Sequence, residues 1–172
     1  MEREYPLLEI EAQNNGITKT DIAVNEVNIA ARTGKMLALD VSLSDKQTIN
    51  IKGDGILIST PAGSTAYNSS LGGPIIPHTI PAFVITPKAP WDPKGQRPIL
   101  VEDSKIIKIN STGRIPNTEI YCDGEELLST DNDQETNIIV KKSQNPITVL
   151  IAEDYLEERD GKVFGELGFQ CG

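Results

Sequence analysis

Residues 37–43 read Leu-Ala-Leu-Asp-Val-Ser-Leu, in which large apolar residues alternate with small or polar ones. An alternation with period two places the apolar side chains on one face of an extended chain, as in a half-buried strand. After a polar turn at 44–46, Ile49 and Ile51 repeat the pattern. The stretch therefore predicts two consecutive strands of one sheet.

The rest of the chain extends this β pattern. Further runs rich in β-branched residues lie at 7–11, 23–30, 55–59, 82–86, 106–109, 137–140 and 147–151, and such runs are typical of strands. Gly63 to Leu71 is small and polar and favours a short helix, and the four prolines between Pro87 and Pro98 indicate a loop. We expect one all-β domain over residues 1–172, β-sandwich-like with two packed sheets and one or two short helices.

Composition excludes several classes of function. The formal net charge of −9 argues against a nucleic-acid groove, which needs a basic patch. The chain has two cysteines, Cys122 and Cys171, and one histidine, His78, with no Cys/His cluster, so no metal site is expected. The few cysteines and the absence of a signal-like start predict a cytoplasmic protein. No apolar run is long enough to span a bilayer, so no membrane association is expected.

The densest motif combines Gly53-Asp54-Gly55, a short apolar strand, and residues 59–67, Ser-Thr-Pro-Ala-Gly-Ser-Thr-Ala-Tyr. Its glycines permit unusual backbone angles and the close approach of a ligand. Ser64 or Thr65 can cap a following short helix, whose free N–H groups would face an anion or a carbonyl. The many hydroxyls suit a nucleoside. The alternative is an ordinary Gly/Ser-rich loop between a strand and a helix; neither a P-loop nor a dinucleotide-binding glycine fingerprint is present.

This motif is similar to the signature of the NAD kinases. The same family has Asn-Glu in an upstream strand, as at Asn25-Glu26, and Asp-Gly late in the chain, as at Asp123-Gly124. Other matching segments are Gly72-Gly73-Pro74, Thr86-Pro87 and Arg97-Pro98. The resemblance runs from about Tyr5 to the end of the chain, and it identifies the chain with the C-terminal, NAD-binding half of an NAD kinase.

The resemblance implies a role for each of nine residues in binding NAD. Asn25 and Thr65 would contact the adenine, and Glu26 would accept hydrogen bonds from a ribose. Asp54 would reach the nicotinamide amide of a neighbouring subunit, and the carbonyl of Ala66 would bind the same group. The remaining residues would line the pocket (Tyr67, Ser70), contribute backbone on its far side (Ala89) or lie near the phosphates (Asp123).

Each of these residues also has a structural interpretation. Asn25 can pair backbone in a bulge, Glu26 can be a surface charge, Asp54 can shape a turn, and Tyr67 can be part of the core. Two departures from the family pattern bear on the same site. Ala62 replaces the usual Thr or Ser, and Lys52 replaces a common Arg, which would weaken bidentate phosphate binding.

The family also carries a Gly-Gly-Asp-Gly motif in an N-terminal domain, and no catalytic residue of that kind is visible in this chain. The resemblance implies phosphorylation of NAD at the 2′-hydroxyl of the adenosine ribose to give NADP, using ATP or polyphosphate with a divalent metal such as Mg²⁺. It further implies a homodimer or homotetramer, and a tail at 154–172 that returns to the N-terminal domain. The chain alone is expected to be inactive. The alternative is a non-catalytic NAD- or NADP-binding or oligomerisation module.

Three other residues have weaker claims. His78 follows a proline in a loop and is more often structural than catalytic in such a setting. Trp91 can stack on a base or plug an apolar gap. Cys122 is expected to be an inert buried thiol in a strand.

Overall fold

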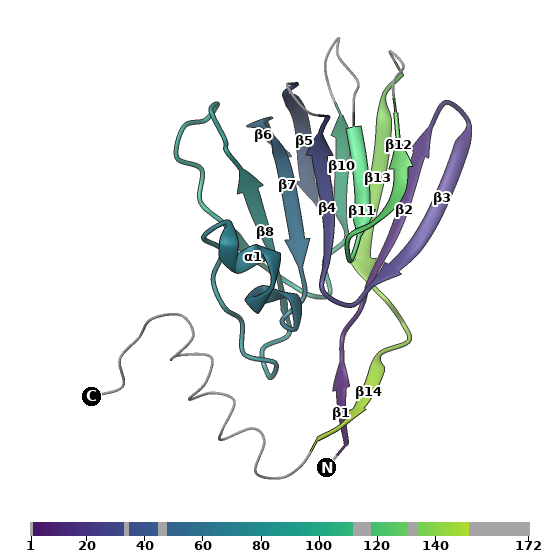
Figure 1. Cartoon of the computed structure of the whole chain (residues 1–172), viewed down its shortest axis with the longest axis vertical. Helices are drawn as coiled ribbons and strands as arrows, with labels where there is room; N and C mark the ends of the chain where they lie inside the picture. Colours follow the sequence, from purple (N-terminus) through teal and green to yellow (C-terminus); the bar gives the residue numbers. More distant parts are fainter. Residues whose placement is uncertain (1, 33–34, 45–47, 112–117, 131–133, 152–172) are drawn as a thin grey trace.

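The fold is built from two six-stranded antiparallel sheets and a separate two-stranded ribbon (Figure 1). This computed structural model describes residues 2–32, 35–44, 48–111, 118–130 and 134–151. The order in the first sheet is β3-β2-β13-β10-β5-β6, and in the second sheet it is β12-β11-β4-β7-β8-β9. The prediction of an all-β protein with two main sheets is confirmed.

The elements have the following bounds. The first sheet contains β2 (Leu8–Asn14), β3 (Ile17–Ala23), β5 (Leu37–Leu43), β6 (Thr48–Gly53), β10 (Ile107–Ser111) and β13 (Thr136–Lys142). The second sheet contains β4 (Glu26–Ala31), β7 (Gly55–Ser59), β8 (Ala82–Lys88), β9 (Ile99–Glu102), β11 (Thr118–Cys122) and β12 (Glu125–Ser129). The ribbon pairs β1 (Glu2–Tyr5) with β14 (Ile147–Leu150).

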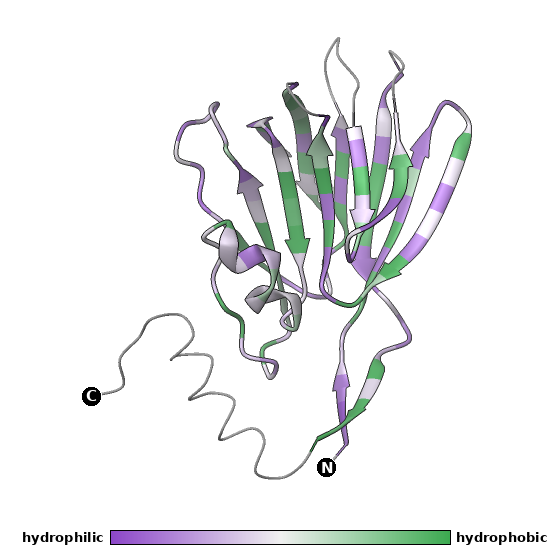
Figure 2. Ribbon diagram, viewed as in Figure 1, coloured by the Kyte–Doolittle hydropathy of each residue, from purple (hydrophilic) through white to green (hydrophobic). Residues whose placement is uncertain are grey.

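One core lies between the two sheets. In β5 the residues Leu37, Leu39 and Val41 are buried and alternate with partly exposed ones, as the period-two pattern predicts. Ile56 and Ile58 of β7 belong to the same apolar cluster, and every residue of β7 is buried. Figure 2 shows the corresponding apolar bands along the strands. The two sheets are therefore held together by a shared aliphatic core.

The Gly53-Asp54-Gly55 turn carries the chain from the first sheet to the second. It joins β6 to β7 through Asp54 alone. Asp54 N donates to Lys88 O over 2.9 Å, and Ala31 N donates to Asp54 O over 2.8 Å. Gly55 has φ +134°, and a Cβ there would collide with the carbonyl oxygen of Ile29. Only glycine fits this crossing without displacing β4.

Two short helical segments follow β7, where one short helix was expected. A 3₁₀ helix, η1 (Gly63–Thr65), precedes the four-residue helix α1 (Tyr67–Ser70). They lie beside β7 and β8 at one end of the second sheet (Figure 1).

The segment from Pro87 to Pro98 is only partly a loop, because β8 continues to Lys88. The expected tail at 154–172 lies outside the described residues.

Candidate functional site

Residues 60–63 of the dense motif pack against Asn25 at the start of β4. Thr60 N donates to Asn25 O over 2.9 Å, and Thr60 Oγ1 donates to Val24 O over 2.7 Å. Gly63 lies so close that a Cβ on it would overlap the Asn25 carbonyl oxygen. The loop and the Asn25-Glu26 segment therefore form one unit, as expected if both belong to one site.

The prediction that Ser64 or Thr65 caps a helix is wrong. Neither η1 nor α1 has a side-chain cap. Ser64 Oγ instead donates to Pro61 O over 2.7 Å and accepts from Ile76 N over 3.0 Å. The N–H of Gly63 is bound by Thr60 Oγ1 at 3.0 Å. These hydroxyls close the loop on itself and on the segment after α1, so they are not free to cap a helix.

Asn68 ties this loop to the second sheet. Its side chain is fully buried. Nδ2 donates to Ser64 O over 3.1 Å and to Pro74 O over 3.0 Å, and Oδ1 accepts from Thr86 Oγ1 over 2.6 Å. One amide thus links the loop, α1, the Gly-Gly-Pro segment and β8.

Asp123 lies beside Asn25 and Glu26. It follows β11 with a left-handed backbone, φ +47°. Its carboxylate accepts from Val24 N over 2.6 Å, from Asn25 N over 2.8 Å and from Glu26 N over 3.0 Å. The structure thus brings the predicted site residues Asn25, Glu26 and Asp123 together. The Asp123 carboxylate accepts hydrogen bonds from backbone N–H groups.

Glu26 presents a carboxylate that the rest of the site does not satisfy. Its Oε2 atom is buried and has no hydrogen-bond partner among the described residues. Glu26 pairs with Ser59 across β4 and β7, so the two side chains share a face. Ser59 Oγ is also buried without a partner in the described part of the chain. Burial raises the pKa of Glu26, and the carboxylate of Asp123 raises it further.

An open cleft of about 560 Å³ lies at the other end of β4. It is lined by Ala31, Arg32, Lys35, Met36, Asp54, Tyr67 and Lys88. The predicted site residues Asp54 and Tyr67 therefore face one space. Lys88 Nζ lies 5.5 Å from the centre of the Tyr67 ring and donates to Asn28 Oδ1 over 3.0 Å. Three basic side chains surround one carboxylate here, so the cleft suits an anionic ligand.

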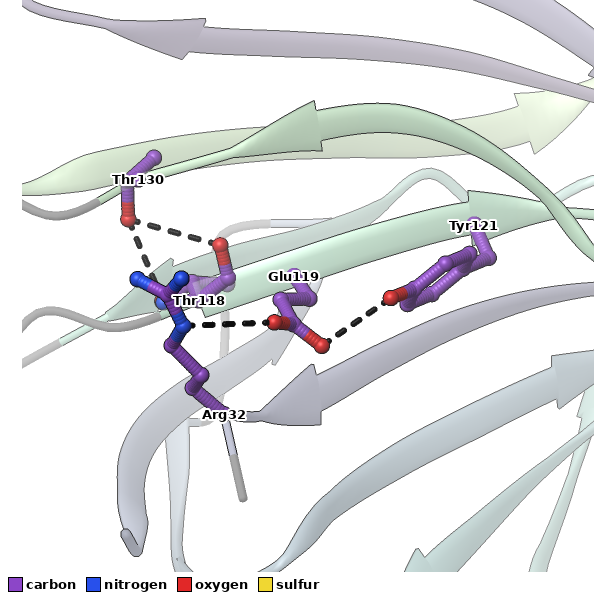
Figure 3. Close-up of polar contacts among 5 residues, drawn as sticks. All are labelled: Arg32, Thr118, Glu119, Tyr121 and Thr130. Atoms are coloured by element: carbon purple, nitrogen blue, oxygen red, sulfur yellow. Dashed lines mark hydrogen bonds and ion pairs between the residues drawn. The ribbon is translucent and has the colours of Figure 1, made fainter.

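Arg32, which lines this cleft, forms an ion pair with Glu119 of β11 in the second sheet. Its Nε lies 3.8 Å from Glu119 Oε1, and Tyr121 OH donates to Glu119 Oε2 over 3.0 Å. Figure 3 shows the three side chains in a row, with the Thr118–Thr130 contacts beside them. The exposed Arg32–Glu119 pair contributes little stability, but it limits where the guanidinium can lie.

The remaining predicted site residues lie around these two regions. Ala89 follows Lys88 with φ +42°, and its carbonyl oxygen is close to Gly53, next to Asp54. Thr65 and Ala66 are exposed between the Asn25 region and Tyr67. Ser70 is exposed at the end of α1, and no described contact joins its side chain to the cleft.

One of the two departures, Lys52, and the weaker candidates also have defined environments. Lys52 Nζ forms an ion pair with Asp92 Oδ2 at 2.7 Å and lies 5.7 Å from the centre of the half-exposed Trp91 ring. The ring of His78 packs edge-on against Tyr5 at 4.6 Å. Burial, with Asp21 and Asp123 nearby, raises the pKa of Cys122 to about 12, which supports an inert thiol.

Sequence reasoning missed several residues of the site. Lys88 lies more than fifty residues after Arg32 and Lys35, and the pairing of β4, β7 and β8 brings it to their cleft. Asn68 lies next to a quoted motif residue, but its bond to Thr86 of β8 could not be read from the local sequence. Among the described residues no group of three or more His, Cys, Asp or Glu side chains could hold a metal ion. No helix in the same part of the chain is long and apolar enough to cross a membrane.

Comparisons with known proteins agree with this architecture. Residues 24–151 match the model of the ATP-NAD kinase C-terminal domain. The chain is similar to the NAD kinase of Shewanella halifaxensis (strain HAW-EB4), with 37% identity over 147 residues, which cover 84% of this chain and 47% of that protein. It is also similar to the NAD kinase of Francisella tularensis subsp. tularensis (strain WY96-3418), with 32% identity, covering 80% of this chain and 46% of the relative. The chain thus spans about half the length of these relatives.

Two solved structures share the fold. Yeast NADH kinase complexed with NADH superposes with a TM-score of 0.81 at 21% identity, over 98% of this chain and 51% of the other. An NAD kinase from Archaeoglobus fulgidus in complex with ATP gives a TM-score of 0.73 at 25% identity, over 94% and 60% of the respective chains.

Proposed function

Because this chain belongs to the family of the ATP-NAD kinase C-terminal domain, we propose that it is the NAD-binding half of an NAD kinase. The reaction proposed for the complete enzyme is phosphoryl transfer to the 2′-hydroxyl of the adenosine ribose, which converts NAD to NADP. The proposal draws support from the NAD kinases of which the chain matches about half. It also draws support from the two regions of the site described above.

The observation that carries the proposal is the unsatisfied carboxylate of Glu26. Buried polar atoms without partners are uncommon in folded proteins. Glu26 Oε2 and Ser59 Oγ are both in this state and lie on one face of adjacent strands. A sugar hydroxyl would donate to the carboxylate and so remove its unmet acceptor. A ribose fits this need better than an apolar ligand does.

The other proposed site residues bind the adenine and the nicotinamide of NAD. Asn25 and Thr65 bind the adenine, and Ala66, Tyr67, Ser70 and Ala89 surround the nicotinamide. Asp54 binds the nicotinamide amide of a neighbouring copy in a homodimer or homotetramer. Its exposure on the rim of an open cleft is compatible with that role. Asp123 completes the same site beside Asn25 and Glu26.

Catalysis is proposed to need more than these residues. The only Gly-Asp-Gly in the chain is at 53–55, in the crossing between the sheets. The base and the cradle for the phosphate donor, ATP or polyphosphate with Mg²⁺, would come from a Gly-Gly-Asp-Gly-bearing segment. The 172-residue chain is therefore proposed to bind NAD weakly and not to phosphorylate it. Robust NADP formation by the pure chain with ATP and Mg²⁺ would contradict this assignment.

Calorimetric or NMR titration of the purified chain with NAD tests the binding. Glu26→Ala is expected to weaken binding by about tenfold or more, because a lost hydrogen bond to a charged group costs about 1.5–3 kcal/mol. Asp54→Ala is expected to weaken binding only at protein concentrations where copies associate. Glu11→Gln, an exposed carboxylate on the first sheet, is the matched control. Equal affinities for the wild type and the first two variants would show that these residues are structural.

A further inference from the structure

Asp123 makes its contacts with the backbone that carries Asn25 and Glu26. Its two carboxylate oxygens accept three N–H groups, from Val24, Asn25 and Glu26, at 2.6–3.0 Å. Asp123 N also donates to Glu26 O over 3.0 Å. A carboxylate offers about four acceptor positions, so most of the capacity of this one is already used within the protein.

The same segment is held from its other side by Thr60. The fully buried Thr60 donates from Oγ1 to Val24 O over 2.7 Å and from its own N–H to Asn25 O over 2.9 Å. The N–H groups of residues 24 and 25 thus point to Asp123, while their carbonyls point to Thr60. A peptide bound on both sides cannot rotate, so the directions of the two following side chains are fixed.

Resting on the proposed function, we infer that Asp123 is a positioning residue that acts through the backbone of Asn25 and Glu26 rather than by contact with the nucleotide. Without it, three consecutive N–H groups would lose their acceptor. The segment would then be free to rotate, and the Glu26 carboxylate would no longer be held toward a ribose. The left-handed backbone of Asp123 is compatible with this role, because Asp and Asn tolerate that conformation better than other side chains.

A competing role is a direct contact with the ligand near its phosphates. The two roles differ in how Asp123 and Glu26 combine. A residue that works through Asn25 and Glu26 loses part of its effect when the Glu26 side chain is removed, whereas an independent ligand contact keeps its full effect. The non-additivity of two substitutions therefore separates the roles.

The binding experiment is a double-mutant cycle for NAD affinity in the full 172-residue chain. We expect Asp123→Asn, which keeps the shape and the backbone compatibility but loses one acceptor and the charge, to weaken binding by about tenfold. In the Glu26→Ala background the same change is expected to weaken binding by a clearly smaller factor, because only the positioning of Asn25 is then left to lose. Asp21→Asn is the control, because Asp21 is an exposed carboxylate that, like Asp123, lies near Cys122. Equal factors in both backgrounds, or no effect of Asp123→Asn alone, would overturn the inference.

Hydrogen exchange provides a readout that does not need the ligand. In Asp123→Asn the amides of Val24, Asn25 and Glu26 are expected to exchange at least about tenfold faster, with Ile29 in β4 unchanged. Unchanged protection at 24–26 would overturn the positioning role. If the wild type binds no NAD, the proposed function fails, while the exchange rates still decide whether Asp123 holds the segment. Asp123→Ala repeats the test with a larger deletion should the conservative variant retain two of the bonds.

Discussion

Glu26 has a raised pKa because it is partly buried and faces Asp123, and this makes its charge unfavourable to folding. A carboxylate whose pKa is higher in the folded state is easiest to accommodate when protonated. The stability linked to it is present at low pH and is lost as the pH rises through the folded pKa. Replacing Glu26 with a neutral residue should therefore raise the free energy of unfolding at neutral pH, although the same change should weaken NAD binding.

The prediction is that Glu26→Gln unfolds at higher urea concentration than the wild type at pH 7.5, with the difference vanishing below about pH 4. Urea unfolding at several pH values measures it. Glu125→Gln controls for removal of an exposed carboxylate at the start of β12. A constant difference at all pH values would show that the Glu26 charge is not the cause.

Cys122 is a second residue with a testable environment. Burial first, and then Asp21 and Asp123, raise the pKa of its thiol to about 12. At pH 8 the folded protein should therefore hold almost no thiolate there, and alkylation should be slow. With Cys171 replaced by serine, iodoacetamide labelling is expected to be at least about a hundredfold slower in the folded chain than in urea. Similar rates in both states would contradict this environment.

At the scale of elements, α1 depends on one side chain. A four-residue helix cannot form alone, because nucleation costs more than one turn returns. Asn68 holds it with three hydrogen bonds in a fully buried position. Asn68→Ala is expected to reduce the free energy of unfolding by about 2–4 kcal/mol, because buried partners lose their bonds. Denaturant titration measures this.

The exposed Asn145→Ala is the control for that change and should have little effect. Asn68→Asp is a sharper variant, since it preserves size but removes the two donor bonds to Ser64 O and Pro74 O. A stable Asn68→Ala protein with unchanged amide exchange at 64–74 would show that the loop is held by its hydroxyls instead.

Burial separates most of the strands that sequence reasoning found from those it missed, although the exposed β14 was predicted and the half-buried β11 was not. The strands at 37–43 and 55–59 were predicted because one or both of their faces are buried and the apolar pattern records it. The strand β3 was missed because six of its seven residues are exposed, so Ile17 and Ile22 stand among polar residues without a period. The edge strands β9 and β12 were also missed, because most of their residues are exposed or partly exposed and their apolar residues show no clear alternation.

The site shows the same limit in another form. Asn25, Glu26, Asp54 and Tyr67 could be proposed as site residues because they stand in recognisable motifs, and their roles stay predictions. The contacts of Asp123 could not be predicted, since its partners are almost a hundred residues earlier and the bonds depend on β11 pairing with β4. The capping prediction for Ser64 and Thr65 failed for another reason, because both hydroxyls donate to carbonyls three residues earlier and Ser64 Oγ also accepts from Ile76 N.

At the scale of the whole molecule, the two sheets share one core and should unfold together. Trp91 is a natural probe of their junction, because its N–H pairs with Lys52 O at the end of β6 while it follows β8 of the other sheet. Urea unfolding followed by Trp91 fluorescence and by far-UV circular dichroism is expected to give coincident curves. Two separated transitions would mean that each sheet is stable without the other.

The ribbon of β1 and β14 has a consequence for how this domain can be combined with others. The pairing of Glu2 with Leu150 sets the two ends of the described fold side by side, away from both sheets (Figure 1). A polypeptide that enters through β1 therefore leaves at the same place. This geometry suits insertion of the domain into a surface loop of a host protein. It also suits circular permutation, in which the two ends are joined and new ends are opened in a loop, with both sheets kept together.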